Sequence, residues 1–281
     1  MTAIIGGFGA ALCWTVAMLC SSRASRDLGA FPTLAWVMAV GFVIVVPFVI
    51  VSGSHPTGVE ATWLFVAGAG NIVGLLFEYT AVRSGKVGIV AAIASTEGAV
   101  AALLSAFAGE PISAGVAAVL ALIATGIVLA SLEQTDDEAN RRSTKAIVFA
   151  SCAALSFGVS LYSVGHVSGD VAFAWLLIPA RLVGVVVITL PLAIRGTLRI
   201  ARRATPLVVG AGVAEVFGIA SFAWGAQDSI GITSVLGSQF AAFSAVGAYF
   251  FFGERLRRIQ VVGVAAIVIG VGLLAVLRTG P

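Results

Sequence analysis

Long apolar runs separated by short polar connections make up nearly the whole chain. Each run holds about 20 mostly apolar residues, the length that an α-helix needs to cross the hydrocarbon core of a bilayer with its backbone hydrogen bonds satisfied. The pattern predicts ten membrane-spanning helices, at residues 2–22, 31–52, 61–83, 86–108, 112–132, 145–165, 171–194, 205–227, 230–252 and 258–277.

The second half of the chain repeats the pattern of the first. Glu110 and Glu254 each follow a glycine and precede a glycine-spaced run, and Gly126 and Gly270 occupy matching places in those runs, 144 residues apart (254 − 110 and 270 − 126). Ala11-Leu12-Cys13-Trp14 matches Ala154-Leu155-Ser156-Phe157 at an offset of 143, and Gly74 matches Gly218 at 144. Because each copy has an odd number of helices, we expect the two copies to be inverted in the membrane. The sequence thus predicts a first five-helix repeat at 1–132, a cytoplasmic linker at 133–144 and a second repeat at 145–281.

Composition places this all-α chain in the membrane. It is 59% hydrophobic and 10% charged with a mean hydropathy of +1.08, whereas a soluble domain carries about 25% charged residues. Cys13, Cys20 and Cys152 lie in apolar runs without a C-x-x-C spacing, so neither a disulfide framework nor a zinc site is indicated. Nothing indicates a cofactor or nucleic-acid binding, and the first run lacks a basic leader and a cleavage site, so we expect it to be a retained helix.

The positive charges predict how the chain is oriented. Lys and Arg gather in the connections that follow odd-numbered helices, whereas the other side carries only Arg278. The positive-inside rule therefore puts the odd connections in the cytoplasm and both termini outside it. We expect a multi-pass protein of the cell's inner (plasma) membrane, as a monomer or loose dimer.

Three ionisable residues lie near the middle of predicted helices: Glu97, Arg181 and Glu215. Each costs about 2.5–3.5 kcal/mol at the bilayer centre, so such residues tend to face a cavity and to be functional. The 144-residue offset aligns Glu215 with Asn71 and Gln239 with Ser95. Polar side chains matched across the repeats at mid-depth predict a substrate-binding or proton-binding site at the repeat interface.

The roles of these residues stay open between function and structure. Glu97 or Glu215 either exchanges protons or binds a cation, or is balanced by Arg181, which cannot neutralise both acids. Arg181 either binds a substrate carboxylate or forms a structural ion pair, the role that we favour. Glu78 is expected near the cytoplasmic mouth, as a gate or as a partner of Arg83 or Lys86.

Aromatic and glycine positions add weaker signals. Trp14 is a candidate for lining a cavity that takes an organic cation, as are Tyr79, Tyr162, Trp224 and Phe243, although packing roles are more common. Gly70-x-x-x-Gly74 favours close helix packing. We expect Glu110 and Glu254 to cap the helices that follow them, because carboxylates are stabilised at helix N-termini.

The duplicated five-helix pattern, with Gly-Glu before each last helix, resembles the drug/metabolite transporter superfamily and its EamA-type members over essentially the full length. The resemblance implies a substrate cavity formed by helices 1 to 4 and 6 to 9, with helices 5 and 10 outside it, and export of small metabolites or drugs driven by protons or exchange. This chain departs from many members in having Ser95-Thr96-Glu97 and Ser238-Gln239 where they have a proline.

The leading hypothesis is a secondary active transporter, a proton-coupled exporter of a small cationic or zwitterionic metabolite or drug by alternating access. The alternative is an electroneutral exchanger or facilitator of amino-acid-like solutes, with Arg181 on the substrate carboxylate. A channel is disfavoured by the lack of a filter-like loop. An intramembrane enzyme is disfavoured because His55 and His166 are not placed to serve a nucleophile. The expected partners are a small-molecule substrate, protons and the lipid bilayer.

Overall fold

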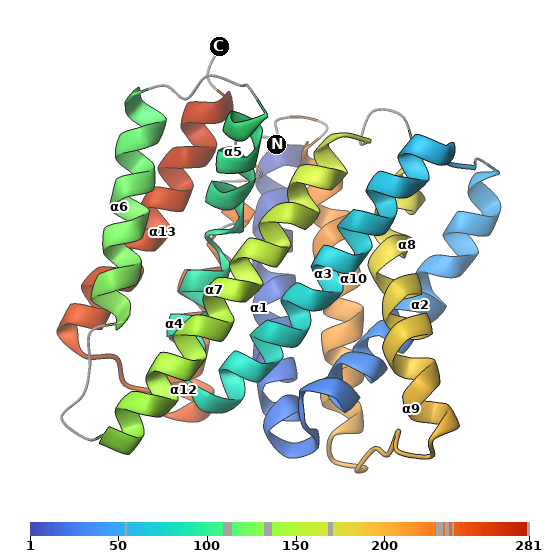
Figure 1. Ribbon diagram of the computed structural model, residues 1–281, viewed down its shortest axis with the longest axis horizontal. Helices are drawn as coiled ribbons and strands as arrows, with labels where there is room; N and C mark the ends of the chain where they lie inside the picture. The colour runs from blue at the N-terminus through green and yellow to red at the C-terminus, as the bar shows by residue number, and fades with distance from the viewer. Residues whose placement is uncertain are drawn as a thin grey trace.

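The computed structural model describes residues 1–53, 55–108, 114–131, 137–167, 171–226, 228, 233, 236–237 and 239–279. Its described part is all α-helical, as predicted (Figure 1). The helices are α1 (Thr2–Leu28), α2 (Ala30–Ser52), α3 (Gly58–Ser84), α4 (Val87–Ala94), α5 (Glu97–Phe107), α6 (Ala114–Ser131), α7 (Asp137–Gly165), α8 (Phe173–Gly184), the π-helix η1 (Val185–Thr189), α9 (Leu190–Ile194), α10 (Thr205–Ala226), α12 (Phe240–Phe252) and α13 (Arg258–Thr279).

Membrane-spanning length is present in the described part of the structure at six of the ten predicted helices. Within the described ranges, six helical segments are long and apolar enough to cross a bilayer, and four shorter apolar helices accompany them. Large apolar side chains cover the outside of the bundle, among them Val43, Phe48, Ile50, Phe250 and Phe251. An exposed apolar surface of this extent suits hydrocarbon and not water.

The predicted continuous helix over 86–108 is wrong, because the helix breaks between α4 and α5. Ser95 Oγ donates a hydrogen bond to the Ala92 carbonyl oxygen at 2.8 Å, and Thr96 Oγ1 donates to that of Ile93 at 2.7 Å. Ser and Thr side chains that bond to nearby backbone in this way compete with the regular helix ladder. The break therefore forms without a proline, and Glu97 becomes the first residue of α5.

Helix ends elsewhere follow the local sequence. Gly29 has a φ of 96° and separates α1 from α2, while Gly53 and Gly253 end α2 and α12 in the left-handed conformation that glycine adopts at low cost. Thr57 and Glu60 form a reciprocal capping box at the start of α3. α7 begins at Asp137, inside the predicted linker, so part of that linker is helical.

Helix pairing supports the proposed inverted repeat. The first helix of each copy packs on the third helix of the other, α1 on α10 and α7 on α3, and the fifth helices α6 and α13 pack together at one edge of the bundle (Figure 1). The second helices of the two copies, α2 and α8, also pack on each other.

Glycine contacts repeat the same symmetry in detail. A Cβ on Gly126 would lie 2.9 Å from Ile267 Cγ1, and one on Gly270 would lie 2.6 Å from Ile123 Cγ1; both the glycines and the isoleucines are 144 residues apart (270 − 126 and 267 − 123). Likewise, a Cβ on Gly74 would lie 2.5 Å from the ring of Phe157, and one on Gly218 would lie 2.6 Å from the indole of Trp14. These matched close approaches support a pseudo-twofold axis in the membrane plane.

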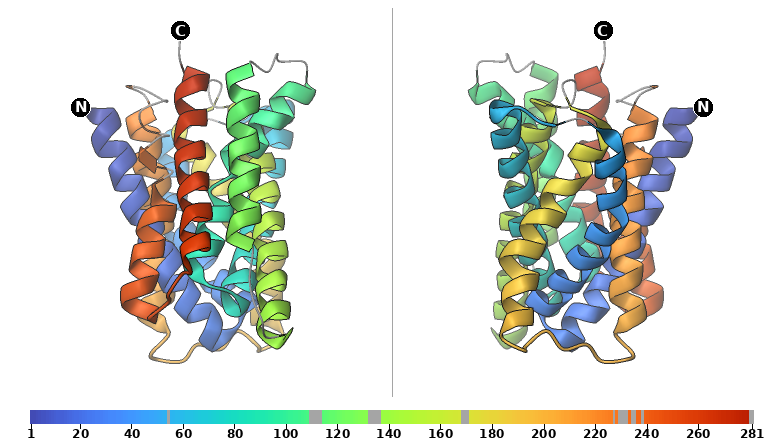
Figure 2. Two further views of the ribbon diagram at one scale, coloured as in Figure 1. Left: turned by 90° about the vertical axis from the view of Figure 1, so that its left-hand side faces the viewer. Right: turned by 90° about the vertical axis from the view of Figure 1, so that its right-hand side faces the viewer.

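Both ends of the chain lie at one end of the bundle, because α1 begins and α13 finishes there (Figure 2). The connections that carry most of the arginines lie at the opposite end. At that basic end Arg26 donates from Nη2 to Glu254 Oε1 at 3.0 Å and from Nε to the Val82 carbonyl oxygen at 2.9 Å. Arg26 thereby joins the C-terminal end of α3 to the α12–α13 connection.

Glu254 does not cap α13 as expected, because the helix begins only at Arg258 and the carboxylate faces Arg26. Gln260 serves the helix start instead: its Oε1 accepts from the Arg257 backbone N–H at 3.1 Å and from Lys86 Nζ at 3.2 Å. The equivalent prediction for Glu110 lies outside the described residues.

Candidate functional site

An ion pair buried in the bundle links α8 to α10. Arg181 Nη2 lies 3.6 Å from Glu215 Oε2, and the two side chains are 2% and 15% exposed. The separation is longer than a hydrogen bond, so the contact is electrostatic. It identifies Glu215 as the partner of Arg181, a choice that the sequence left open between Glu215 and Glu97.

Small residues make room for this arginine. A Cβ on Gly41 of α2 would lie 3.1 Å from Arg181 Cγ and 3.2 Å from its Nε, so the guanidinium stem packs directly on the α2 backbone. Gly68 of α3 approaches Pro179 more closely still, since a Cβ on it would lie 2.6 Å from the Pro179 carbonyl carbon. The helix carrying Arg181 is therefore held against both α2 and α3.

Two further carboxyls face the same region. Glu97 is close enough to interact electrostatically with Glu215, and Glu78 interacts with both of them. The phenol of Tyr79, 1% exposed, interacts with Glu215, Glu78 and Arg181. We call Glu78, Glu97, Glu215 and Arg181 the acidic cluster. It holds three carboxyls and one guanidinium, and the guanidinium interacts with Glu215 and with the Tyr79 phenol.

Glu97 owes its position to the helix break. As the first residue of α5 it lies at the N-terminus of a half-helix, where the unpaired N–H groups favour negative charge. Close packing by α7 fixes the backbone here, because a Cβ on Gly158 would lie 3.0 Å from the Glu97 carbonyl oxygen and 2.4 Å from Val100 Cγ1. A broken helix that presents a half-helix end at mid-depth is typical of transporter binding sites.

Glu78 lies deeper than the sequence analysis placed it. Its residue is 8% exposed, and its electrostatic neighbours are Glu215 and Glu97. Asn71, two turns earlier on α3, has its Oδ1 buried with no hydrogen-bond partner among the described residues. The amide therefore has spare hydrogen-bonding capacity on the helix that carries Glu78 and Tyr79.

Trp14 extends the site toward α12. Its indole packs on Gly218, which lies one helical turn from Glu215 on α10. The ring also meets Phe222 at a centroid distance of 5.8 Å and Phe240 at 6.1 Å. Gln239 directly precedes Phe240 and is the N-cap residue of α12.

Sequence reasoning missed the supporting glycine. Gly41 is one of 33 glycines in the chain, and its role depends on which side chain faces it across a helix interface, which no local pattern reports. Tyr79 was among several aromatic candidates, and only burial beside charged groups separates it from the others. Within the described residues, no group of three or more His, Cys, Asp and Glu is placed to hold a metal ion.

Comparison with known proteins agrees with this architecture. Residues 1–132 match the model of the EamA-like transporter family. The fold is similar to a protein of known crystal structure, with a TM-score of 0.63 and 18% identity over 99% of this chain and 98% of that one. At that identity the likeness concerns the fold alone. No curated protein sequence matches the chain. The matches confirm the predicted family resemblance and the all-α ten-helix fold class.

Proposed function

Because residues 1–132 belong to the EamA-like transporter family, we propose that the chain is a secondary active transporter that exports a small organic cation or zwitterion in exchange for protons. Members of this family are multi-pass membrane proteins that transport small solutes. The family match also confirms that the chain is a transporter and not an enzyme. The choice of substrate charge and of protons as the coupling ion is our inference from the acidic cluster.

One observation carries this inference: three carboxyls lie within electrostatic range of one another inside an apolar bundle, and among the described residues Arg181 pairs with Glu215 and not with Glu97 or Glu78. Buried like charges destabilise one another, so the carboxyls without a counter-ion must hold a proton or a cation. A group that accepts either is suited to exchange, because binding of one expels the other. Trp14 beside Glu215 adds an aromatic face that suits an organic cation.

Within this proposal the two paired groups and the two unpaired acids have different tasks. Arg181 and Glu215 hold α8 to α10 and set the charge of the site. Glu97, at the end of a half-helix, and Glu78 exchange protons for the substrate. Helices that break at mid-depth are the elements that move most readily between the two access states.

The test uses purified protein in liposomes that contain a trapped pH-sensitive dye. A panel of small quaternary amines and zwitterionic amines is added with and without a pH gradient. We expect at least one amine to drive proton movement in the wild type, and Glu97→Gln to abolish it. Glu60→Gln is the matched control, because glutamine preserves the capping box at the start of α3. Full gradient-driven transport in both Glu97→Gln and Glu78→Gln would contradict proton coupling through the cluster.

The second candidate is an electroneutral exchanger or facilitator of amino-acid-like solutes. The observation that favours it is the buried Nε of Arg181, which has no hydrogen-bond partner among the described residues. A substrate carboxylate could occupy that donor in a bidentate fork. Two results together would support this function over proton-coupled export. The wild type would show counterflow of labelled amino acids without proton movement, and Arg181→Lys would lose that counterflow.

A further inference from the structure

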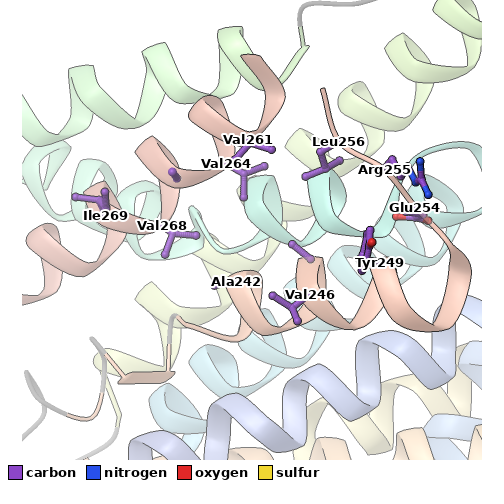
Figure 3. A pocket seen from close by; sticks show the side chains of 12 residues that line it. Ala242, Val246, Tyr249, Glu254, Arg255, Leu256, Val261, Val264, Val268 and Ile269 are labelled. Carbon is purple, nitrogen blue, oxygen red and sulfur yellow. The ribbon is translucent and has the colours of Figure 1, made fainter. Parts of the chain in front are cut away.

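An apolar groove of about 840 Å³ runs along the outside of the bundle between α12 and α13 (Figure 3). Small and branched side chains line it, among them Ala242, Val246, Val264, Ala265 and Val268. Val246 and Ile269 are each 57% exposed, so the groove opens toward the surroundings and not toward the acidic cluster. In a membrane protein such a groove faces the acyl chains of lipids.

Polar groups gather at only one end of the groove. Figure 3 shows Tyr249, Glu254 and Arg255 together there, with Val268 and Ile269 toward the other end. Glu254 is already paired with Arg26 at 3.0 Å. The exposed Arg255 side chain forms no hydrogen bond or ion pair with the part of the chain that the structure describes, and exposed Arg257 and Arg258 follow it. This end of the groove therefore carries uncompensated positive charge.

We propose that the groove binds an anionic phospholipid of the bilayer, with an acyl chain between α12 and α13 and its phosphate on Arg255. The Tyr249 hydroxyl is placed to donate a hydrogen bond to the same headgroup. Val261 and Ile269 are eight residues apart, or about 12 Å along α13, which fits within the roughly 15 Å hydrocarbon depth of one leaflet. Basic sites beside transmembrane helices recognise anionic headgroups by this combination of charge and depth.

Charge argues against a second copy of the chain as the occupant. A twofold interface brings the same surface of both copies together. Two copies meeting along this groove would bring Arg255, Arg257 and Arg258 of each into a shared region, and like charges that meet at an interface oppose association. An anionic lipid neutralises them instead. This site is independent of the proposed transport function.

The experiment is native mass spectrometry of the purified full chain in detergent. Phosphatidylglycerol and phosphatidylcholine with identical acyl chains are added at matched concentrations. One basic residue near an anionic membrane surface contributes about 1 kcal/mol, or about fivefold. We expect phosphatidylglycerol to bind about fivefold more tightly than phosphatidylcholine, and Arg255→Gln to remove that preference.

Two matched pairs of variants locate the site. Arg199→Gln removes another exposed charge, between α9 and α10 at the same end of the bundle, and is expected to keep the preference. Ala265→Phe fills the groove and is expected to reduce binding of both lipids, whereas Ala124→Phe on the exposed face of α6 is expected to leave it unchanged. Equal binding of the two lipids, loss of preference in Arg199→Gln but not in Arg255→Gln, or a dimer that Ala265→Phe disrupts would each overturn the proposal.

Discussion

Replacing Arg181 with methionine tests how much the acidic cluster depends on its one positive charge. The side chains of Arg181 and Glu215 are 3.6 Å apart and almost fully buried. At an effective dielectric constant of about 20, two unit charges at this distance attract by about 5 kcal/mol, and removing one member of a buried pair typically costs about 3–5 kcal/mol. We therefore expect Arg181→Met to lower the free energy of unfolding by about 3–5 kcal/mol.

The cluster predicts an asymmetry between the two partners. Arg181→Met strands the Glu215 carboxylate, which can take up a proton, whereas Glu215→Gln strands the Arg181 guanidinium, which cannot lose one. Glu215→Gln should therefore also cost about 3–5 kcal/mol, and its cost should not fall between pH 7 and pH 5. The double variant Arg181→Met/Glu215→Gln should recover part of the loss of Arg181→Met, because one stranded carboxylate is gone.

The assay is reversible unfolding in bicelles, followed at pH 7 and again at pH 5. The loss in Arg181→Met should shrink at pH 5, because stranded carboxylates are relieved when they bind protons. A loss of less than about 1 kcal/mol, or a loss in Arg181→Met that does not shrink at pH 5, would refute the electrostatic account of the cluster.

Three further predictions concern packing and the two ends of the bundle. Gly218→Ala should destabilise the fold by about 1–2 kcal/mol, because the clash with the Trp14 indole exceeds the gain in helix propensity. The control Gly58→Ala places its methyl group in open space and should not destabilise the fold. Thermal unfolding of the two variants measures the difference. Arg26→Gln should speed trypsin cleavage after Arg255 severalfold, because the α12–α13 connection loses its ion pair; an unchanged rate would contradict this anchoring role. A hydrogen bond from the Thr2 side chain, followed by one from the Ala3 N–H, lowers the pKa of Asp228. Its contribution should be present above about pH 3.9 and lost as pH falls through the folded-state pKa, so Asp228→Asn should speed amide exchange of Ala3 at pH 7.

The number and places of the helices could be predicted because bilayer crossing demands about 20 apolar residues, a requirement visible in any window of the chain. Breaks in the helices within those apolar runs could not be predicted from the sequence. The interruption before Glu97 depends on two hydroxyl hydrogen bonds from Ser95 and Thr96, and the π-helix ends where Thr189 Oγ1 donates to the Ala35 carbonyl oxygen at 2.9 Å. Both depend on local hydrogen bonding, which hydropathy does not report.

The candidate site could likewise be predicted only in part from the sequence. The sequence was enough to identify three ionisable residues in apolar runs, Glu97, Arg181 and Glu215, because the cost of burying a charge applies to each residue separately. The partner of Arg181 depends on how α8 faces α10, which is a property of the tertiary packing. Glu78 was placed near the mouth because Arg83 follows it closely, yet α3 continues to Ser84 and puts Glu78 about 9 Å inside the helix end.

In the proposed function, the acidic cluster contains a carboxyl that exchanges a proton for substrate. Dicyclohexylcarbodiimide reacts with protonated carboxyls in apolar surroundings, and peptide mass spectrometry identifies the residue that it labels. We expect labelling of Glu97 or Glu78 in protein reconstituted in liposomes, with weaker labelling of the paired Glu215. An amine that drives proton movement should protect the labelled residue. Labelling confined to acids outside the cluster, or labelling of Glu97 and Glu78 that no transported amine reduces, would contradict the proposed function.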